Sequence, residues 1–139
     1  MVDLNLVAIR LKKDEEVVLK PYVDTVGKTT IGTGRNLTDK GISIEENDYL
    51  LHNDIHDALD NLSIYTWFTS LDPVRQLVMV CMMFNLGPTR FAGFSNMLKY
   101  MQAHDYVDAS IEMLNSKWAT QVGQRARDYA QMIKQGILI

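Results

Sequence analysis

The chain changes its residue pattern abruptly, and this change most constrains the fold. A stretch over about 17–37 is rich in Val, Thr, Ile and Tyr and contains Pro21, Gly27, Gly32 and Gly34. Such a pattern predicts two or three short strands joined by tight turns. Because proline has no amide hydrogen to donate to a ladder, the strand with Pro21 is expected at an edge or to begin there.

Helical periodicity flanks this segment on both sides. Asp3 is placed to cap a helix over about 3–13, which ends in three consecutive carboxylates. Downstream, Ser43 followed by Glu46 forms a capping box. The helix that starts there is predicted to extend to about Leu62 and to connect the β region to the rest of the chain.

The remaining sequence is helical in pattern. Pro73 suits a first turn, and the run Leu77–Phe84 is apolar on all sides, which predicts a central buried helix stopped by Gly87 and Pro88. Further helices are predicted from Ser95 to about Gln102, from Asp105 to about Asn115, and from Gly123 to Gly136. We therefore predict one predominantly helical α+β domain. Its predicted parts are a β-containing lobe at about 14–42, an inter-lobe helix at about 43–62, and a larger helical lobe at about 63–139 that includes the helix 3–13.

Length and composition set limits on function. The 139 residues suffice for one domain with a core, and the single Cys81 excludes an intrachain disulfide or a cysteine-built zinc site. We expect no signal peptide and no stable membrane insertion, because charge appears by the third residue and the longest apolar run is short. The net charge of −3 argues against a nucleic-acid partner. Residues 1–70 have a net charge of −5, and residues 71–139 have a net charge of +2.

Two carboxylates suggest a chemistry. Glu15 ends the first helix, and Asp24 lies just before the Gly27 turn. If they face each other across a cleft, one protonated carboxyl can donate to a leaving oxygen while the other, ionised, positions water, as glycoside hydrolysis requires. Taken alone, a solvated helix end and a turn residue are the simpler interpretations.

A longer ordered pattern carries more information. The string Asp14-Glu15, Leu19-Lys20, Tyr22, Asp24-Thr25, Gly27, Thr30-Ile31-Gly32 and Gly34 resembles the active-site signature of the T-even phage lysozymes, glycoside hydrolase family 24. The resemblance continues at matching intervals through Ser43-x-x-Glu46, Leu71-Asp72-x-Val74-Arg75, Phe84-x-x-Gly87, Ala92-Gly93-Phe94-x-Asn96, Ser116-x-Trp118 and Arg125-Ala126. It spans nearly the whole chain and implies a lysozyme-like fold.

The resemblance also implies roles. Glu15 matches the general acid, Asp24 the second carboxylate, and Thr30 a hydroxyl that helps to hold the attacking water. The implied reaction is hydrolysis, with inversion, of the β-1,4 bond between N-acetylmuramic acid and N-acetylglucosamine. Inversion requires the two carboxyl groups to stand about 6.5–9.5 Å apart. Arg125 matches an arginine that orients the glutamate.

Other positions match substrate-binding sites, namely Gly34, Asn36, Phe84 and Asn85. Phe84 can equally belong to the core, and Trp118 is expected there. No cofactor or metal is implied. The pair His52 and His56 has a spacing that can bind zinc, but it lacks a third ligand, so a solvated helix face is the simpler interpretation.

Several residues depart from the family pattern. Arg35 replaces a histidine, and we expect it to pair with Asp54. Glu16 replaces a glycine after the catalytic position, and Asn36, Met97 and Glu112 differ at positions expected to face the cleft. These departures bear on saccharide and peptide preference.

Two alternatives stay open. A lytic transglycosylase would cleave the same bond without water, and a non-catalytic wall-binding domain would keep only the fold. The preferred interpretation is a phage-type endolysin that acts on bacterial peptidoglycan. We expect a monomer that accumulates in the host cytoplasm and depends on a holin to reach the cell wall.

Overall fold

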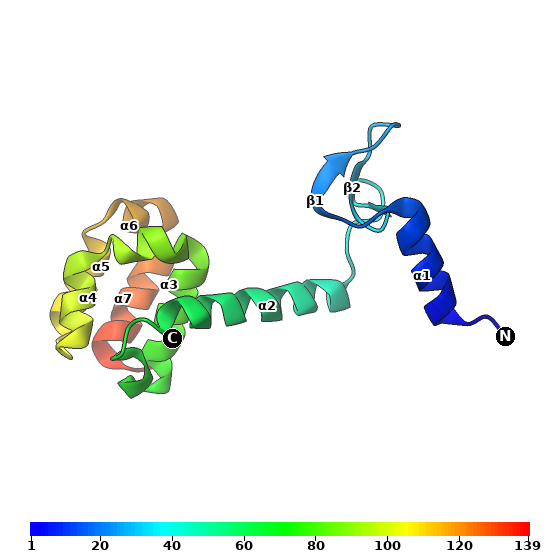
Figure 1. The fold of residues 1–139 in the computed structure, drawn as a ribbon. Helices are drawn as coiled ribbons and strands as arrows, with labels where there is room; N and C mark the ends of the chain where they lie inside the picture. Colours follow the sequence, from blue (N-terminus) through cyan, green and yellow to red (C-terminus); the bar gives the residue numbers. More distant parts are fainter. The chain divides into compact units, whose positions relative to one another are not determined.

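The computed structural model describes residues 1–139 and contains seven α-helices, one short 3-10 helix and a three-stranded sheet (Figure 1). In chain order these are α1 (Leu4–Glu15), β1 (Val18–Val23), β2 (Thr29–Gly32), β3 (Arg35–Asn36), α2 (Ile44–Leu62), η1 (Phe68–Ser70), α3 (Pro73–Ala92), α4 (Ser95–Gln102), α5 (Tyr106–Leu114), α6 (Lys117–Val122) and α7 (Gln124–Gln135). The predominantly helical α+β fold is thereby confirmed. The chain forms two compact units, unit 1 (Met1–Tyr49) and unit 2 (Leu50–Ile139).

The sheet of unit 1 is a small antiparallel meander. Its strand order is β1-β2-β3, so β1 is an edge strand that pairs with β2 alone. The register of β1 is irregular between Val18 and Tyr22, the interval that contains Pro21. The prediction of an edge position for Pro21 is confirmed, and the physical reason is its missing amide hydrogen.

The two helices that begin within unit 1, α1 and α2, start at side-chain caps that the sequence predicts. Asp3 Oδ1 accepts from the amides of Asn5 and Leu6 at the start of α1. At the start of α2 the Glu46 amide donates to Ser43 Oγ at 3.1 Å, and the Ser43 amide donates to Glu46 Oε1 at 2.9 Å. This reciprocal pair is the predicted capping box.

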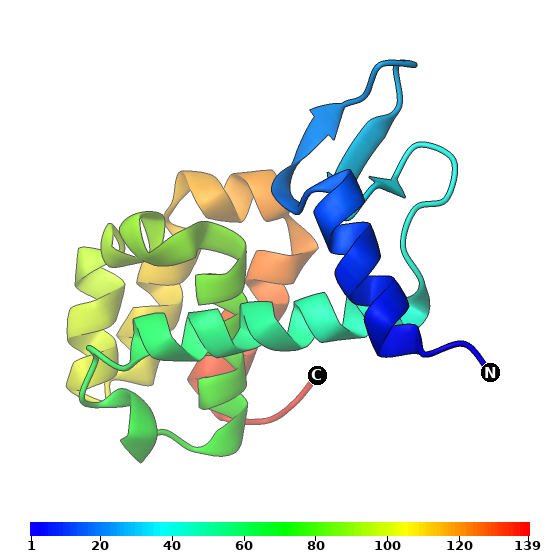
Figure 2. The ribbon, with the colours of Figure 1, turned by 45° about the vertical axis from the view of Figure 1, so that its right-hand side comes forward.

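Unit 2 is a bundle in which α4, α5, α7 and α3 lie side by side in that order (Figures 1 and 2). Its core is apolar and unusually rich in methionine, a flexible side chain that fills irregular gaps. Val78, Met79 and Met82 of α3 are fully buried. The prediction that this helix is buried on all sides is wrong at both ends of the run, because Leu77 is 41% and Phe84 50% exposed.

The helix boundaries of unit 2 mostly follow the predicted signals. Asp72 caps α3 through the Arg75 amide, and Gly87, at φ 78°, interrupts the helix. Ser95 does not act as a cap, since Phe94 occupies that position and makes no side-chain capping bond. The short helix α6 was not predicted.

No single helix is long and apolar enough to cross a bilayer. Helices α3 and α4 would together have sufficient length and hydropathy, but a bend of 108° separates them.

Arg75 ties the start of α3 to the end of α7. Its Nε donates to the Ile133 carbonyl at 2.6 Å, and its guanidinium also reaches Lys134 O and Asp72 Oδ1. The same guanidinium lies 3.8 Å from the ring centroid of Tyr106. One planar fork therefore satisfies carbonyls at the α7 terminus and stacks on an aromatic ring.

We predict that Arg75→Lys destabilises the protein by about 1–3 kcal/mol, because an ammonium cannot make this set of bonds and leaves the α7 carbonyls unpaired. Urea denaturation measures the change. Arg127→Lys on the exposed face of α7 is the matched control and should be near neutral. Equal stability of the two variants would contradict the prediction.

Candidate active site

Glu15 is held at the end of α1, where the chain turns sharply. The next residue, Glu16, has φ 60° and ψ 157°, a conformation that L-residues rarely adopt. This conformation accounts for the glycine expected by resemblance at that position. Facing Glu15, Gly34 has φ 68°, and a Cβ added to it would stand 3.3 Å from Glu15 Oε2. The backbone of the β2–β3 turn therefore lies directly against the Glu15 carboxylate.

Asp24 closes the turn that follows β1. Its Oδ1 accepts from the amides of Val26 at 3.0 Å and Lys28 at 2.8 Å. Its own amide donates to the Lys28 carbonyl at 2.9 Å. Both side-chain bonds use the same oxygen, so Oδ2 takes no part in holding the turn. The carboxylate is fixed by one oxygen and can present the other.

Thr30 is connected to Asp24 through a shared residue. It is the buried polar residue of unit 1, 4% exposed, and its Oγ1 donates to the Lys28 carbonyl at 3.0 Å. That carbonyl is the one that accepts from the Asp24 amide. Because the hydroxyl proton is used internally, the Thr30 oxygen offers lone pairs, which can accept a hydrogen bond from water.

Both side chains of β3 have partners within unit 1, and the partner of Arg35 differs from the predicted one. The Asn36 amide group bonds Asp39 twice, through Nδ2 to Oδ2 and through Oδ1 to the Asp39 amide. Arg35 Nη2 lies 2.7 Å from Glu46 Oε2, so the predicted pairing of Arg35 with Asp54 is wrong. The same Glu46 carboxylate also accepts from the Ser43 amide in the capping box. The Arg35 guanidinium, followed by the Ser43 amide, lowers the pKa of Glu46 to about 2.

In unit 2, three predicted residues line one hollow of about 480 Å³. Phe84, Asn85 and Arg125 surround it together with apolar side chains of α2 and α3. Asn85 Oδ1 accepts from the indole Nε1 of Trp118 at 2.7 Å, which fixes the orientation of the amide. Trp118 is buried, as predicted.

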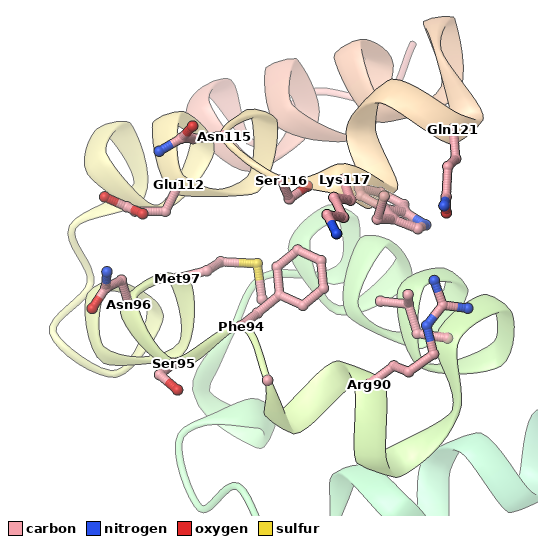
Figure 3. A pocket seen from close by; sticks show the side chains of 13 residues that line it. Arg90, Phe94, Ser95, Asn96, Met97, Glu112, Asn115, Ser116, Lys117 and Gln121 are labelled. Atoms are coloured by element: carbon pink, nitrogen blue, oxygen red, sulfur yellow. The ribbon is translucent and has the colours of Figure 1, made fainter.

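A larger hollow of about 700 Å³ opens between α4 and α6 of the same unit (Figure 3). Met97 and Glu112, two of the positions that depart from the family pattern, line it. Figure 3 shows Glu112 near one end and Arg90 near the other, with Phe94 between them. The hollow therefore offers an acidic end, a basic end and an aromatic side chain.

The structure thus brings the predicted residues together in three groups. Glu15 meets Gly34, Asp24 is linked to Thr30, and Phe84, Asn85 and Arg125 share a hollow. Sequence reasoning missed Lys28, whose backbone connects Asp24 to Thr30. A backbone contact needs no particular side chain, so the residue type at position 28 carries no signal of this role. The sequence pattern of a turn followed by a strand at 24–30 is the one feature that could have indicated the contact.

A small sheet that carries candidate carboxylates, followed by a helical unit, is compatible with a glycoside hydrolase, and the class is shown by comparisons with known proteins. A model of the phage lysozyme family matches residues 12–131. The chain is 27% identical to a protein described as probable T4-type lysozyme 2 of Dictyostelium discoideum, over 92% of this chain and 93% of the relative. It is 26% identical, with the same coverage, to probable T4-type lysozyme 1 of that organism.

The chain belongs to the phage lysozyme family. It is accordingly a lysozyme, an enzyme that hydrolyses bacterial peptidoglycan.

We predict that Gly34→Ala reduces lytic activity by about tenfold or more, because the new methyl group at 3.3 Å must displace the Glu15 carboxylate. Gly41→Ala is the matched control. Its φ of 64° imposes a similar backbone strain of about 1 kcal/mol, but nothing lies within 4 Å of the added Cβ. Turbidity assays and melting curves on both variants separate lost activity from lost stability. Equal activities would contradict the prediction.

Glu46 should make stability depend on acid pH. Its folded pKa of about 2 lies below the ordinary 4.5, so its contribution is complete above pH 4.5 and is lost as pH falls towards 2. In Glu46→Gln this part of the pH dependence should be missing. Urea unfolding of both proteins between pH 6 and pH 2 measures the difference, and parallel profiles would contradict the assignment.

Proposed function

We propose that the enzyme cleaves the β-1,4 bond between N-acetylmuramic acid and N-acetylglucosamine with inversion at the anomeric carbon. Glu15 acts as the general acid that protonates the leaving oxygen. Asp24 is the ionised carboxylate that stabilises positive charge on the sugar and activates water. The observation that carries this proposal is the hydrogen-bonded connection of Asp24 to Thr30 through Lys28, within unit 1.

That connection supports a water-dependent reaction. Thr30 is buried and donates to protein, which leaves its oxygen to accept from a water molecule. Asp24 uses one oxygen for the turn, so the other can accept a proton from the same water. An inverting pair must leave room for this water, and we expect the Glu15 and Asp24 carboxyl groups about 6.5–9.5 Å apart.

Residues of unit 2 are proposed to bind and orient. Asn85, held by Trp118, presents an amide for an acetamido group, and Phe84, half exposed, offers a face for a sugar ring. Arg125 is proposed to orient the general acid. Gly34 and Asn36 are proposed to contact substrate through the backbone, since the Asn36 side chain is occupied by Asp39.

The hollow between α4 and α6 suits the peptide part of the substrate. Glu112 can accept an ammonium group, whereas Arg90 and Lys117 can bind carboxylates. Its neighbouring amide side chains can pair with peptide groups. A peptide that carries both charges fits this hollow better than an uncharged saccharide does.

We propose a phage-type endolysin as the biological role. A bacteriolytic enzyme of this kind would accumulate in the host cytoplasm, act as a monomer and reach the wall through a membrane lesion made by a holin. The family match supports this role, although the two relatives come from Dictyostelium discoideum. The alternatives are a lytic transglycosylase and a non-catalytic wall-binding domain.

The test is mass spectrometry of products from purified peptidoglycan, combined with the variant Glu15→Gln. We expect wild type to release muropeptides with a reducing end, and Glu15→Gln to be slower by about 10²–10⁴ because it cannot donate the proton. Glu45→Gln, an exposed acid in the first turn of α2, is the matched control and should keep activity.

The outcomes separate the alternatives. Products with a 1,6-anhydro end would identify a lytic transglycosylase. Absence of any product from wild type would favour the wall-binding domain. Full activity of Glu15→Gln would overturn the assignment of the acid.

A further inference from the structure

Two histidines that the proposed reaction does not use lie together on α2. His52 and His56 are one helical turn apart and exposed, and their ring centroids are 4.5 Å apart with an interplanar angle of 70°. The third histidine, His104, has a partner of its own, since its Nδ1 lies 2.8 Å from the Tyr106 hydroxyl. The pair on α2 is therefore a distinct feature of the surface of unit 2.

The spacing of the two rings matches a shared metal ion. An imidazole nitrogen binds a divalent transition metal at about 2.0–2.1 Å, which puts the metal about 3.2 Å from the ring centroid. When each ring turns one nitrogen to a common ion, centroids 4.5 Å apart make the two metal–imidazole directions meet at about 90°. That is the angle between neighbouring positions of a tetragonal or octahedral ion, whereas a tetrahedral ion would require centroids about 5.2 Å apart.

The charge of α2 also favours a cation. The helix Ile44–Leu62 contains no lysine or arginine, and it carries acidic residues throughout. Asp48 precedes His52 by one turn, and Asp60 follows His56 by one turn, so all four side chains share one stripe of the helix. Since no group of three or more such side chains converges, two imidazoles would be the protein ligands and water would complete the shell.

We propose that His52 and His56 chelate one divalent transition-metal ion, with copper(II) bound more tightly than nickel(II) or zinc(II). The preference follows from the intrinsic affinity order of these ions and from the right-angle geometry. The ion binds the folded helix, because the unfolded chain does not hold two imidazoles one turn apart. Binding therefore stabilises the native state, and this proposal does not rest on the proposed function.

The test is a copper(II) titration of the chelator-treated full chain. Calorimetry measures the stoichiometry and affinity of binding, and electron paramagnetic resonance identifies the nitrogen ligands. We expect one ion per chain with the signature of two imidazole nitrogens. His52→Ala and His56→Ala should each weaken binding by about tenfold or more. His104→Gln should bind like wild type.

A composition-matched control tests the geometry. The double variant H56D/D57H exchanges two neighbouring residues, keeping both histidines and the net charge. It moves the second imidazole about 140° around the helix from the first, so chelation is lost. Thermal melting with nickel(II) gives a second readout: wild type should melt at a higher temperature with the ion, and H56D/D57H should not.

Several results would overturn the proposal. Affinity of H56D/D57H equal to that of wild type would mean that the pair does not chelate. Binding that survives in the double variant H52A/H56A would assign the ion to the amino terminus or another group. Absence of one-to-one binding in wild type would also reject the site.

Discussion

The burial of α3 is the constraint on which unit 2 depends. Val78, Met79 and Met82 of this helix are fully enclosed, and α7 packs against it. Its beginning is set by the Asp72 cap and by Arg75, which binds the end of α7, while Gly87 interrupts it. Because both ends are determined, the residues just before Gly87 are placed as well. Phe84 and Asn85 therefore reach a hollow in a defined position, supported by Trp118.

In unit 1 the same contacts serve structure and proposed catalysis. From sequence, a turn role and a catalytic role for Asp24 are alternatives. In the structure the turn uses a single carboxylate oxygen, Oδ1. The two roles are thus compatible, since the turn holds the carboxylate and leaves its second oxygen for a ligand. Glu15 lies against Gly34 in a comparable way, where the lack of a side chain permits the close approach.

Helix α2 concentrates acidic charge, and this charge is used locally. Glu46 completes the capping box and forms an ion pair with Arg35. The sequence predicted the capping role but not the ion pair. The absence of basic residues from the helix leaves its histidine pair in a setting that favours cations. The net charge of −3 is therefore an average over surfaces of different character, which include the basic groups beside the hollow between α4 and α6.

The sequence by itself determined the elements that depend on local physics. Caps at Asp3, Ser43, Asp72 and Asp105, the edge position of Pro21 and the termination at Gly136 were all predictable, because each depends on residues a few positions apart. The ordered motif likewise indicated Glu15, Asp24 and Thr30 as the residues of the proposed catalytic site. Tertiary structure alone decided that Arg35 binds Glu46 and that Leu77 and Phe84 are exposed. These outcomes depend on which groups the folded backbone brings within bonding distance, and an apolar or charged residue type does not specify its partner.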